Sequence, residues 1–530
     1  MKVAFRVDAS LSIGIGHGVR CRTLANALRL YGVDVRFICR AHSGHMGAAL
    51  ERDGFQVAWL PTVLDTSDAQ DNYAAWLGVS QATDATDTIA ALDGERPDWL
   101  IVDHYGLDAE WERRLRPHAA HIMAIDDLAN RLHDCDVLLD QNYSEDLANR
   151  YKTLVPADCR RLLGPRYALL RSEYVAHRKS IAPHADAVQR VLVFFGTEKT
   201  VSYTSMALDA LCENEFAHLQ VDVLTSTDNP HYDAIVQQVS HRPNIQLHGM
   251  RPHLADLMAN VDMAIGAGGT TMWERMCIGL PSMVVGIADN QQPACEALSR
   301  QDLIYYAGPA SVVNAGVLKR VLIEMLADPI RLESQRAKGQ MLVDGMGIAR
   351  VLEALWPSAK TDLHLRPASE SDMLTYLTWV NDPTVRASAF DSAPISLENH
   401  RAWFRRRLND PNTFLFVLEA RGLPIGQIRF ECEQDEAIID YSLDEFVRKR
   451  GWANELMRLG VQQFQTAMGA SIKAIVKHEN LASAAVFLRA GFTEQHTDND
   501  ANEPRVFRLP PPAMPNARHY ASVLANSNRE

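Results

Sequence analysis

The chain has 530 residues, a formal net charge of −13 at pH 7, 47% hydrophobic residues and 22% charged residues. This length predicts about three domains. The composition is that of an ordinary soluble protein, and an acidic balance without a basic run argues against nucleic-acid binding. The eight cysteines are scattered without a Cys-x-x-Cys pair. No apolar run approaches about 18 residues, so we expect no membrane span. We also expect no signal peptide. The scattered cysteines predict reduced thiols in a cytoplasmic protein.

The first predicted unit is a strand over residues 3–7, a glycine-rich turn and a helix over residues 19–30. Gly14 and Gly16 would let a ligand approach the backbone, and the helix start would offer free N–H groups to an anion. That positive end favours a neutral, proton-accepting imidazole at His17; the alternative is a capped turn with a solvent-facing His17. Val19 stands where the dinucleotide fingerprint requires glycine, so a nicotinamide enzyme is disfavoured.

Polar residues follow several apolar strands of the first third. A strand at 33–39 and a helix at 44–53 lead to apolar runs at 99–103, 122–127 and 137–142. Such runs predict a parallel sheet buried on both faces. Their ends carry Asp103, His104, Asp126, Asp127 and Asn142. Ligands collect at such strand ends, but we expect most of these residues to cap the following helix.

A second series of strands predicts a second doubly wound sheet. Residues 162–171 are expected to form a crossing segment between the two sheets. The predicted strands cover residues 190–195, 221–224, 245–248, 263–265 and 282–285. Two such sheets in tandem are typical of enzymes that bind their substrate in a cleft between domains.

The stretch Gly266-Ala-Gly-Gly-Thr-Thr-Met-Trp-Glu274 lies between a predicted strand and a predicted helix. Glycines and threonines at a helix start form a phosphate cradle. Glu274 could accept hydrogen bonds from a ribose diol, or could simply complement the helix dipole. Asp289-Asn-Gln291 precedes another helix near the same sheet edge. The sequence has no P-loop and no cluster of metal ligands, so no metal is expected.

Residues 1 to about 355 resemble the nucleotide-sugar hydrolases of pseudaminic acid synthesis, which release UDP from UDP-2,4-diacetamido-2,4,6-trideoxy-β-L-altropyranose. The resemblance rests on Arg6-Val-Asp-Ala-Ser10, Gly14-Ile-Gly-His17, Asp103-His-Tyr-Gly106, Ile125-Asp-Asp127, Gly164-Pro-x-Tyr-Ala-Leu-Leu-Arg171, Gly266-Ala-Gly-Gly-Thr270, Trp273-Glu-Arg275 and Ala288-Asp-Asn-Gln291. It implies a GT-B fold in which His17 activates water. The implied UDP-sugar contacts are Gly14, Gly16, Asp103, Tyr105, Gly268, Gly269, Thr270, Glu274, Asn290 and Gln291. One departure is Gly196-Thr-Glu-Lys199, where the family has Gly-Gly-Thr/Ser-Asp.

The last third resembles the GNAT acetyltransferases. Strands are predicted at 414–419, 424–430 and 438–443, and Arg448-Lys-Arg-Gly-Trp-Ala453 fits the pyrophosphate loop of that family. A closing unit with His478-Glu-Asn480 and Gly491-Phe492 follows. The resemblance implies acetyl-CoA contacts at Arg448, Arg450, Gly451, Ala453 and Asn480. It also implies direct attack by an amine, with the oxyanion held by backbone N–H groups of the strand at 438–443.

The general acid of this second domain is open. Phe487 stands where the family often has the tyrosine that protonates the leaving thiolate, and phenylalanine has no proton to give. Tyr441 or water would have to replace it, and we expect Tyr441 chiefly to pack. Asp440 and Glu479 are candidate bases of equal standing.

These patterns predict an α/β protein with two Rossmann-like domains at 1–175 and 176–355, a mixed α/β GNAT domain at 363–497, and a partly disordered tail at 498–530. The predicted function is bifunctional. The GNAT domain would acetylate a UDP-amino sugar with acetyl-CoA, and the GT-B region would then hydrolyse the product to UDP and free sugar. The alternatives are a GT-B glycosyltransferase that uses a UDP-sugar donor, and a hydrolase with a non-catalytic GNAT module.

Overall fold

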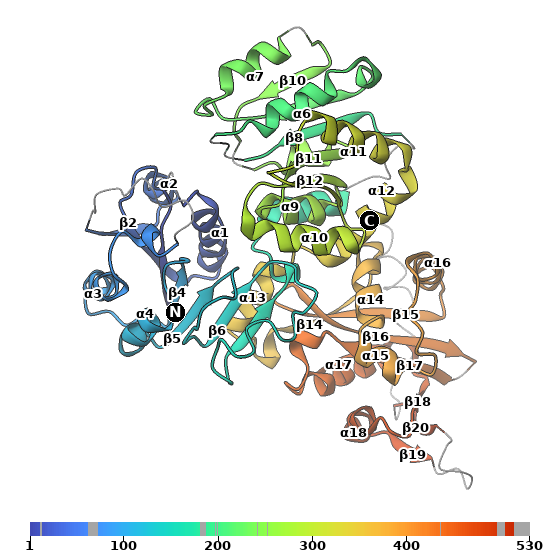
Figure 1. Cartoon of the computed structure of the whole chain (residues 1–530). Coiled ribbons are helices and arrows are strands. Elements are labelled where there is room, and N and C mark those ends of the chain that lie inside the picture. Colours follow the sequence, from blue (N-terminus) through green and yellow to red (C-terminus); the bar gives the residue numbers. More distant parts are fainter. Residues whose placement is uncertain are drawn as a thin grey trace. The chain divides into compact units, whose positions relative to one another are not determined.

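The structure of the protein is a computed structural model that describes residues 1–10, 13–61, 73–180, 187–196, 198, 200–240, 242–251, 253–434, 436–495 and 504–512. The chain divides into two compact units, residues 1–355 and 356–530 (Figure 1). The first unit contains two sheets and the second contains one. Among the described residues, no helix has the length and apolar character needed to cross a bilayer.

The first sheet has seven parallel strands in the order β3-β2-β1-β4-β5-β6-β7. The strands are β1 (Lys2–Val7), β2 (Asp34–Arg40), β3 (Gln56–Leu60), β4 (Trp99–Asp103), β5 (His121–Ile125), β6 (Val137–Asp140) and β7 (Arg160–Leu163). Its helices are α1 (Gly16–Leu30), α2 (Gly47–Arg52), α3 (Gln81–Leu92) and α4 (Ala109–Leu115). Helix α1 begins at Gly16 rather than at residue 19, so His17 lies in its first turn.

The second sheet has six parallel strands in the order β10-β9-β8-β11-β12-β13. The strands are β8 (Arg190–Phe194), β9 (Gln220–Leu224), β10 (Ile245–His248), β11 (Met263–Ala267), β12 (Ser282–Gly286) and β13 (Tyr305–Pro309). The helices of this half are α5 (Ser172–Ser180), α6 (Tyr203–Leu211), α7 (Tyr232–Val239), α8 (Ala255–Ala259), α9 (Thr270–Ile278), α10 (Gln292–Arg300), α11 (Ala315–Ala327), α12 (Pro329–Leu342) and α13 (Gly347–Leu355).

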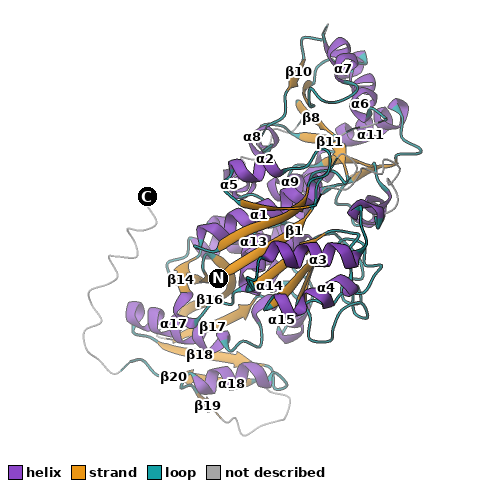
Figure 2. Cartoon of the chain, turned by 90° about the vertical axis from the view of Figure 1, so that its left-hand side faces the viewer, coloured by secondary structure: helices purple, strands orange, loops and turns teal. Residues whose placement is uncertain are grey.

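The central strands of both sheets are buried on both faces, as the continuous apolar runs predicted, and helices line the strands on either side (Figure 2). Along β8, Val191 and Val193 belong to one hydrophobic cluster, whereas Leu192 and Phe194 belong to another. This alternation follows from the two-residue period of a strand. The predicted α/β fold class, with two doubly wound sheets followed by a mixed sheet, is confirmed.

The boundary between the two halves differs from a simple cut near residue 175. Residues 162–171 were expected to cross between the sheets, but Arg160–Leu163 form the edge strand β7 of the first sheet. Ala168, Leu170 and Tyr174 then join a hydrophobic cluster of the second sheet. At the far end of the unit, α13 returns to contact α1, and the indole nitrogen of Trp99 donates to the carbonyl of Leu355 at 3.1 Å.

The second unit is built on a mixed sheet in the order β14-β15-β16-β17-β18-β20-β19. The strands are β14 (Leu363–Pro367), β15 (Thr413–Ala420), β16 (Leu423–Glu433), β17 (Glu436–Leu443), β18 (Ser471–Val476), β19 (Thr493–Gln495) and β20 (Arg505–Leu509). Its helices are α14 (Met373–Val380), α15 (Pro383–Ser388), α16 (Leu397–Leu408), α17 (Trp452–Met468) and α18 (Leu481–Arg489). The mixed α/β architecture expected for this region is confirmed.

Two features of this sheet concern the predictions. Strands β17 and β18 are parallel and pair from Glu436 to Ile438 with residues 471–473, and the ladder stops before Ile439. The rest of β17 therefore runs without a ladder to β18, as a splayed strand does. The expected tail from residue 498 is wrong for residues 505–509, because they form β20 between β18 and β19. Residues 498–503 and 513–530 lie outside the described residues.

Candidate active site and coenzyme site

His17 forms a pair with a buried carboxylate. The first turn of α1 carries the imidazole, and Nδ1 lies 2.6 Å from Oδ1 of Asp103 at the carboxyl end of β4. Strand β4 pairs with β1 so that Asp103 lies beside Val7, directly before the chain leaves β1 for the glycine turn. His17 is 8% exposed and Asp103 is fully buried. The alternative of a solvent-facing His17 is therefore wrong.

The carboxylate determines what the imidazole can do. With Nδ1–H donating to Asp103, Nε2 keeps its lone pair and can accept a proton. Arg20 donates to both oxygens of Asp103, from Nη2 at 2.7 Å and from Nε at 2.7 Å. Burial raises the pKa of Asp103, but the charge of Arg20 and the hydrogen bonds from Arg20 and His17 outweigh it and hold that pKa well below its usual range. Asp103 was expected to contact substrate; it is inaccessible instead and orients His17.

Asp127 links the same arginine to Tyr105. Its Oδ2 accepts from Arg20 Nη1 at 2.6 Å and from the Tyr105 hydroxyl at 2.5 Å. Burial and the nearby Asp127 charge raise the pKa of Tyr105 well above its usual value, so this hydroxyl keeps its proton. Because the Tyr105 hydroxyl donates its hydrogen bond to Asp127, Tyr105 can meet a ligand only through its ring or as a hydrogen-bond acceptor.

The helix-capping role expected for these strand-end carboxylates is wrong for Asp103 and Asp127. Helix α4, which follows β4, is capped by Asp108, whose side chain accepts from the Glu110 N–H at 2.8 Å. Asp103 and Asp127 instead surround Arg20. Together with a neutral His17, these side chains carry a net charge of −1. A proton taken up by His17 would neutralise a buried cluster, which is the electrostatic condition that a general base needs.

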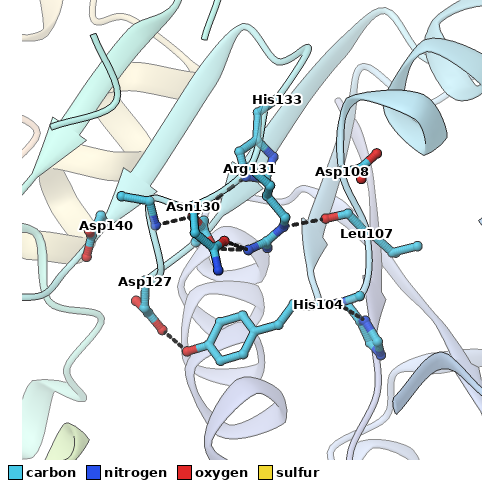
Figure 3. Close-up of polar contacts among 12 residues, drawn as sticks. His104, Leu107, Asp108, Asp127, Asn130, Arg131, His133 and Asp140 are labelled. Carbon is cyan, nitrogen blue, oxygen red and sulfur yellow. Dashed lines mark hydrogen bonds and ion pairs between the residues drawn. The ribbon is translucent and has the colours of Figure 1, made fainter. Parts of the chain in front are cut away.

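A second buried network includes His133 and Asp140, which Figure 3 labels. His133 Nδ1 lies 2.8 Å from Glu112 and its Nε2 lies 3.6 Å from Asp126. Burial lowers the pKa of His133, but the two carboxylates raise it to about 9. Asp140 contacts Arg150 and Tyr151. Burial and the Asp127 charge raise the pKa of Asp140 to about 7.

The remaining predicted strand-end residues have structural roles. His104 accepts from the Gly106 N–H at 3.0 Å through Nδ1, and burial lowers its pKa to about 4. The backbone N–H of Asn142 donates to Asp140 at 2.8 Å. In the glycine turn, Gly14 has a φ of +82° and Gly16 opens α1 without a side-chain cap. The backbone N–H groups expected to face a ligand are thus at a helix start without a capping side chain.

The predicted diphosphate cradle joins β11 to α9. Helix α9 begins at Thr270 with Gly269 as its N-cap, and no side chain caps it. A Cβ on Gly268 would lie 2.4 Å from the Cys295 sulfur, so only glycine fits there. A Cβ on Gly269 would lie 3.5 Å from Gln291 Nε2, an ordinary contact distance. Gln291 thus borders both glycines, while its Oε1 accepts from the Ile287 N–H at 3.2 Å. The neighbouring Asn290 is exposed.

Glu274 lies in the same helix, one turn from the cradle. Tyr174 of α5 donates a hydrogen bond to it. Burial raises the pKa of Glu274 to about 7, although the Tyr174 hydrogen bond and the charges of Arg171 and Arg275 oppose the shift. This carboxyl therefore changes its charge near neutral pH, in contrast to an ordinary first-turn glutamate.

The stretch Gly196-Thr-Glu-Lys199 departs from the family pattern, and the structure explains one of its residues, Glu198. Gly196 has a φ of +78°, and Glu198 is buried. Glu198 accepts from the backbone N–H and the hydroxyl of Thr204, both at 2.8 Å, and from Asn229 at 3.0 Å. It therefore fastens the start of α6. Thr197 and Lys199 lie outside the described residues.

The predicted coenzyme loop of the second unit precedes α17. Gly451 has a φ of +78° and is the N-cap of α17, which no side chain caps. Ala453 lies in the first turn. Arg448 is tied to the fold, because it contacts Asp382 at 2.9 Å and donates to the Leu443 carbonyl at 3.1 Å. The Arg450 guanidinium lies over the rings of Phe446 and Trp452, with its carbon 5.2 and 5.4 Å from their centroids.

Asn480 and Tyr441 both meet the start of α18. The Asn480 side chain caps this helix by accepting from the Ser483 N–H at 3.1 Å. The Tyr441 hydroxyl donates to the Ser483 hydroxyl at 3.4 Å, and its ring meets Phe487 edge to face at 5.7 Å. Phe487 itself is buried against Phe492 and Phe507. Tyr441 therefore brings a hydroxyl to the helix face on which Phe487 lies. Asp440 pairs with Arg429 at 3.2 Å.

Sequence reasoning grouped His17, Asp103 and Tyr105 correctly as neighbours but missed Arg20 and the aromatic residues Tyr73 and Trp76. Arg20 follows His17 by three positions on α1, a spacing that places two side chains on one helix face, so the signal was present. No periodic pattern marks Tyr73 and Trp76. Within the described part of the chain, no group of three or more His, Cys, Asp or Glu side chains could hold a metal ion.

Comparison with known families assigns the second unit. Residues 362–493 match the model of the acetyltransferase (GNAT) domain family. The first unit combines two doubly wound parallel sheets with a histidine–carboxylate pair at one strand end and an uncapped glycine-rich helix start at another. The chain thus joins a first unit of two doubly wound parallel sheets to a second unit that matches the GNAT acetyltransferase domain.

Three curated proteins are similar to most of this chain or to its first unit. The UDP-2,4-diacetamido-2,4,6-trideoxy-beta-L-altropyranose hydrolase of Campylobacter jejuni is 24% identical over 303 residues, which cover 57% of this chain and 97% of the hydrolase. The spore coat polysaccharide biosynthesis protein SpsG of Bacillus subtilis is 23% identical, over 67% of this chain and 98% of SpsG. The uncharacterized protein MJ1062 of Methanocaldococcus jannaschii is 20% identical, over 94% of this chain and 99% of MJ1062.

Proposed function

We propose that the first unit hydrolyses a UDP-linked diacetamido-trideoxy sugar to UDP and free sugar. The observation that carries this proposal is the contact of His17 Nδ1 with buried Asp103, which leaves Nε2 as a proton acceptor. The similarity to the altropyranose hydrolase supports the choice of substrate. Gly268, Gly269 and Thr270 would hold the diphosphate, Glu274 the ribose, and Asn290 and Gln291 would border the nucleotide.

The proposed reaction needs one base and no carboxylic acid. Nε2 of His17 takes a proton from water while the water oxygen bonds to the anomeric carbon. The bond between that carbon and the phosphate oxygen breaks, and UDP leaves with the electron pair. A diphosphate is a good leaving group once its charge is held, so helix-start N–H groups replace the acid of an ordinary glycosidase.

For the second unit we propose acetylation of a UDP-amino sugar, the substrate of the first unit before its second acetamido group is complete. The amine nitrogen attacks the acetyl carbonyl and loses one proton to solvent, the carbon–sulfur bond breaks, and the thiolate of coenzyme A gains a proton. The N–H groups of Gly451 and of the α17 start would hold the coenzyme pyrophosphate, with Arg448, Arg450, Ala453 and Asn480 around it. Tyr441 is our candidate for the residue that donates a proton to this thiolate.

A direct assay tests the hydrolase proposal. The diacetamido UDP-sugar is supplied with water as the only acceptor, and UDP and free sugar are measured by coupled assay and mass spectrometry. Loss of His17 in His17→Ala should lower the rate about 10²–10⁴-fold. Release of UDP at the parent rate by that variant would remove His17 from its role. Release that depends on an added acceptor sugar would instead indicate a glycosyltransferase.

Thiol release from acetyl-CoA tests the second proposal. With the UDP-amino sugar present, the wild-type protein should release coenzyme A and gain one acetyl group on the sugar. Tyr441→Phe should lower that rate without weakening acetyl-CoA binding, because only the hydroxyl is removed. Binding of acetyl-CoA with no turnover would indicate a non-catalytic module.

A further inference from the structure

Three aromatic side chains form a wall beside His17, which we define as Tyr73, Trp76 and Tyr105. The Tyr105 ring meets the imidazole edge to face, with centroids 4.5 Å apart, and the Trp76 centroid lies 6.2 Å from it. Trp76 stacks on Tyr105 at 5.6 Å, and Tyr73 meets both rings edge to face at 4.8 and 5.1 Å. The wall thus adjoins the imidazole that is proposed to act at the anomeric carbon.

The fold holds this wall in place. Trp76 lies in a short 3₁₀ helix, Ala75–Leu77, which Leu77 anchors in the core of the first sheet and Gly78 ends with a φ of +70°. Gly106, next to Tyr105, leaves room for the backbone of Tyr73 to approach. A Cβ at Gly106 would lie 2.7 Å from the Tyr73 carbonyl oxygen and 3.1 Å from His104. The glycine of the Asp103-His-Tyr-Gly106 motif is therefore required by the wall.

The members of the wall differ in what they can offer a ligand. Tyr105 is 7% exposed and donates its hydroxyl hydrogen bond to Asp127, whereas Tyr73 and Trp76 are partly exposed. A ligand beside His17 would therefore meet mainly the aromatic carbon surface of Trp76 and Tyr73. Such a surface gains from burying methyl and C–H groups, while a hydroxyl buried against it loses its hydrogen bonds to water.

We propose that this wall is the sugar subsite, and that Trp76 determines specificity by selecting a sugar with a methyl group at C6 over one with a hydroxymethyl group. This inference rests on the proposed hydrolase function and adds the part of the substrate that is recognised. It agrees with the chemistry of a 2,4,6-trideoxy diacetamido sugar, which presents methyl groups where common hexoses present hydroxyls.

The test compares two UDP-sugars of the same configuration that differ only in carrying a methyl or a hydroxymethyl group at C6. Wild-type protein should prefer the methyl sugar about tenfold or more in kcat/KM. Trp76→Ala should reduce that preference to under about threefold by raising KM for the methyl sugar, with kcat changed much less. Trp76→Phe should lie between the two, and Trp59→Ala, which removes an exposed tryptophan of β3, is the control.

Two outcomes separate this inference from the hydrolase proposal. Full preference in a folded Trp76→Ala variant, or in Trp76→Phe if the alanine variant does not fold, would overturn the role of Trp76. If the wild-type protein releases no UDP from either sugar, the hydrolase proposal fails, and saturation-transfer NMR of the same two compounds decides the subsite. Contact of the C6 methyl with the protein that is lost in Trp76→Ala would support it; contact that is unchanged would overturn it.

Discussion

Asp103 and His17 are joined by one short contact, 2.6 Å between Oδ1 and Nδ1, although they lie 86 positions apart in the chain. The contact exists because the carboxyl end of β4 and the first turn of α1 meet at the same sheet edge. The contact fixes the tautomer of the imidazole and provides a counter-charge for the imidazolium that forms during the reaction.

Replacing this carboxylate while keeping its shape should disable the base. Asp103→Asn should lower kcat for UDP release about 10²–10⁴-fold with little change in KM, because the counter-charge is lost and the substrate contacts are kept. Steady-state kinetics measures this. Asp108→Asn is the matched control, since asparagine also caps a helix well. Equal rates for wild type and Asp103→Asn would contradict the pairing role.

The glycine loop before α9 offers two substitutions with opposite expectations. Gly269→Ala meets only ordinary contacts in the fold, so thermal stability should stay near wild type while UDP affinity falls about tenfold or more as the methyl group crowds the cradle. Gly266→Ala places a Cβ 2.3 Å from the Phe194 carbonyl oxygen and should destabilise the fold by about 1–3 kcal/mol. Calorimetric titration with UDP and thermal unfolding measure the two effects. Unchanged UDP affinity in Gly269→Ala would place the diphosphate elsewhere.

The raised pKa of Glu274, about 7, predicts a pH dependence of UDP binding. Below pH 7 this carboxyl is mostly protonated, and above it the carboxylate can accept two hydrogen bonds from a ribose diol. UDP affinity should therefore rise between pH 6 and pH 8 in the wild type. Glu274→Gln should remove this component, whereas the ionisation of UDP itself remains in both proteins. Parallel pH profiles for the two proteins would exclude Glu274 from ribose binding.

His133 predicts a pH dependence of stability. Its pKa is raised to about 9 in the folded protein, from an ordinary value near 6.5, by the Asp126 and Glu112 carboxylates. A raised histidine pKa stabilises the fold fully below pH 6.5, and that contribution is lost as pH rises through 9. The loss should reach about 3 kcal/mol at most. Urea unfolding at pH 6.5 and 9.5 should show a smaller fall in His133→Gln; identical falls would contradict the prediction.

More of the fold than of the candidate site could be predicted from the sequence. Continuous apolar runs such as 99–103 and 282–285 predicted both parallel sheets, because a strand buried on two faces has no polar alternation. β7 was missed because Arg160 and Arg161 interrupt its apolar run, and β20 was missed because charged residues flank Phe507. In both strands, pairing with a neighbour overrides the local composition.

The sequence could mark candidate site residues only where residues of one motif lie together. It marked His17 and the Gly266–Glu274 loop because glycines at a helix start are visible locally, and their roles stay predictions. The role of Asp103 was wrong, because a carboxylate at a strand end looks the same whether it contacts a ligand or a buried arginine. Trp76 could not be found, since its place beside His17 depends on a turn that only the folded chain brings there.

The position of β20 determines where the acetyltransferase region can be truncated for expression. The matched acetyltransferase region ends at residue 493, yet β20 runs from Arg505 to Leu509 and lies between β18 and β19. A shortened protein ending at 493 would leave the backbone donors and acceptors of β18 open along a sheet edge that Ala474 and Val476 make apolar, and such edges recruit other chains. Expression of the acetyltransferase region by itself should therefore extend past Leu509.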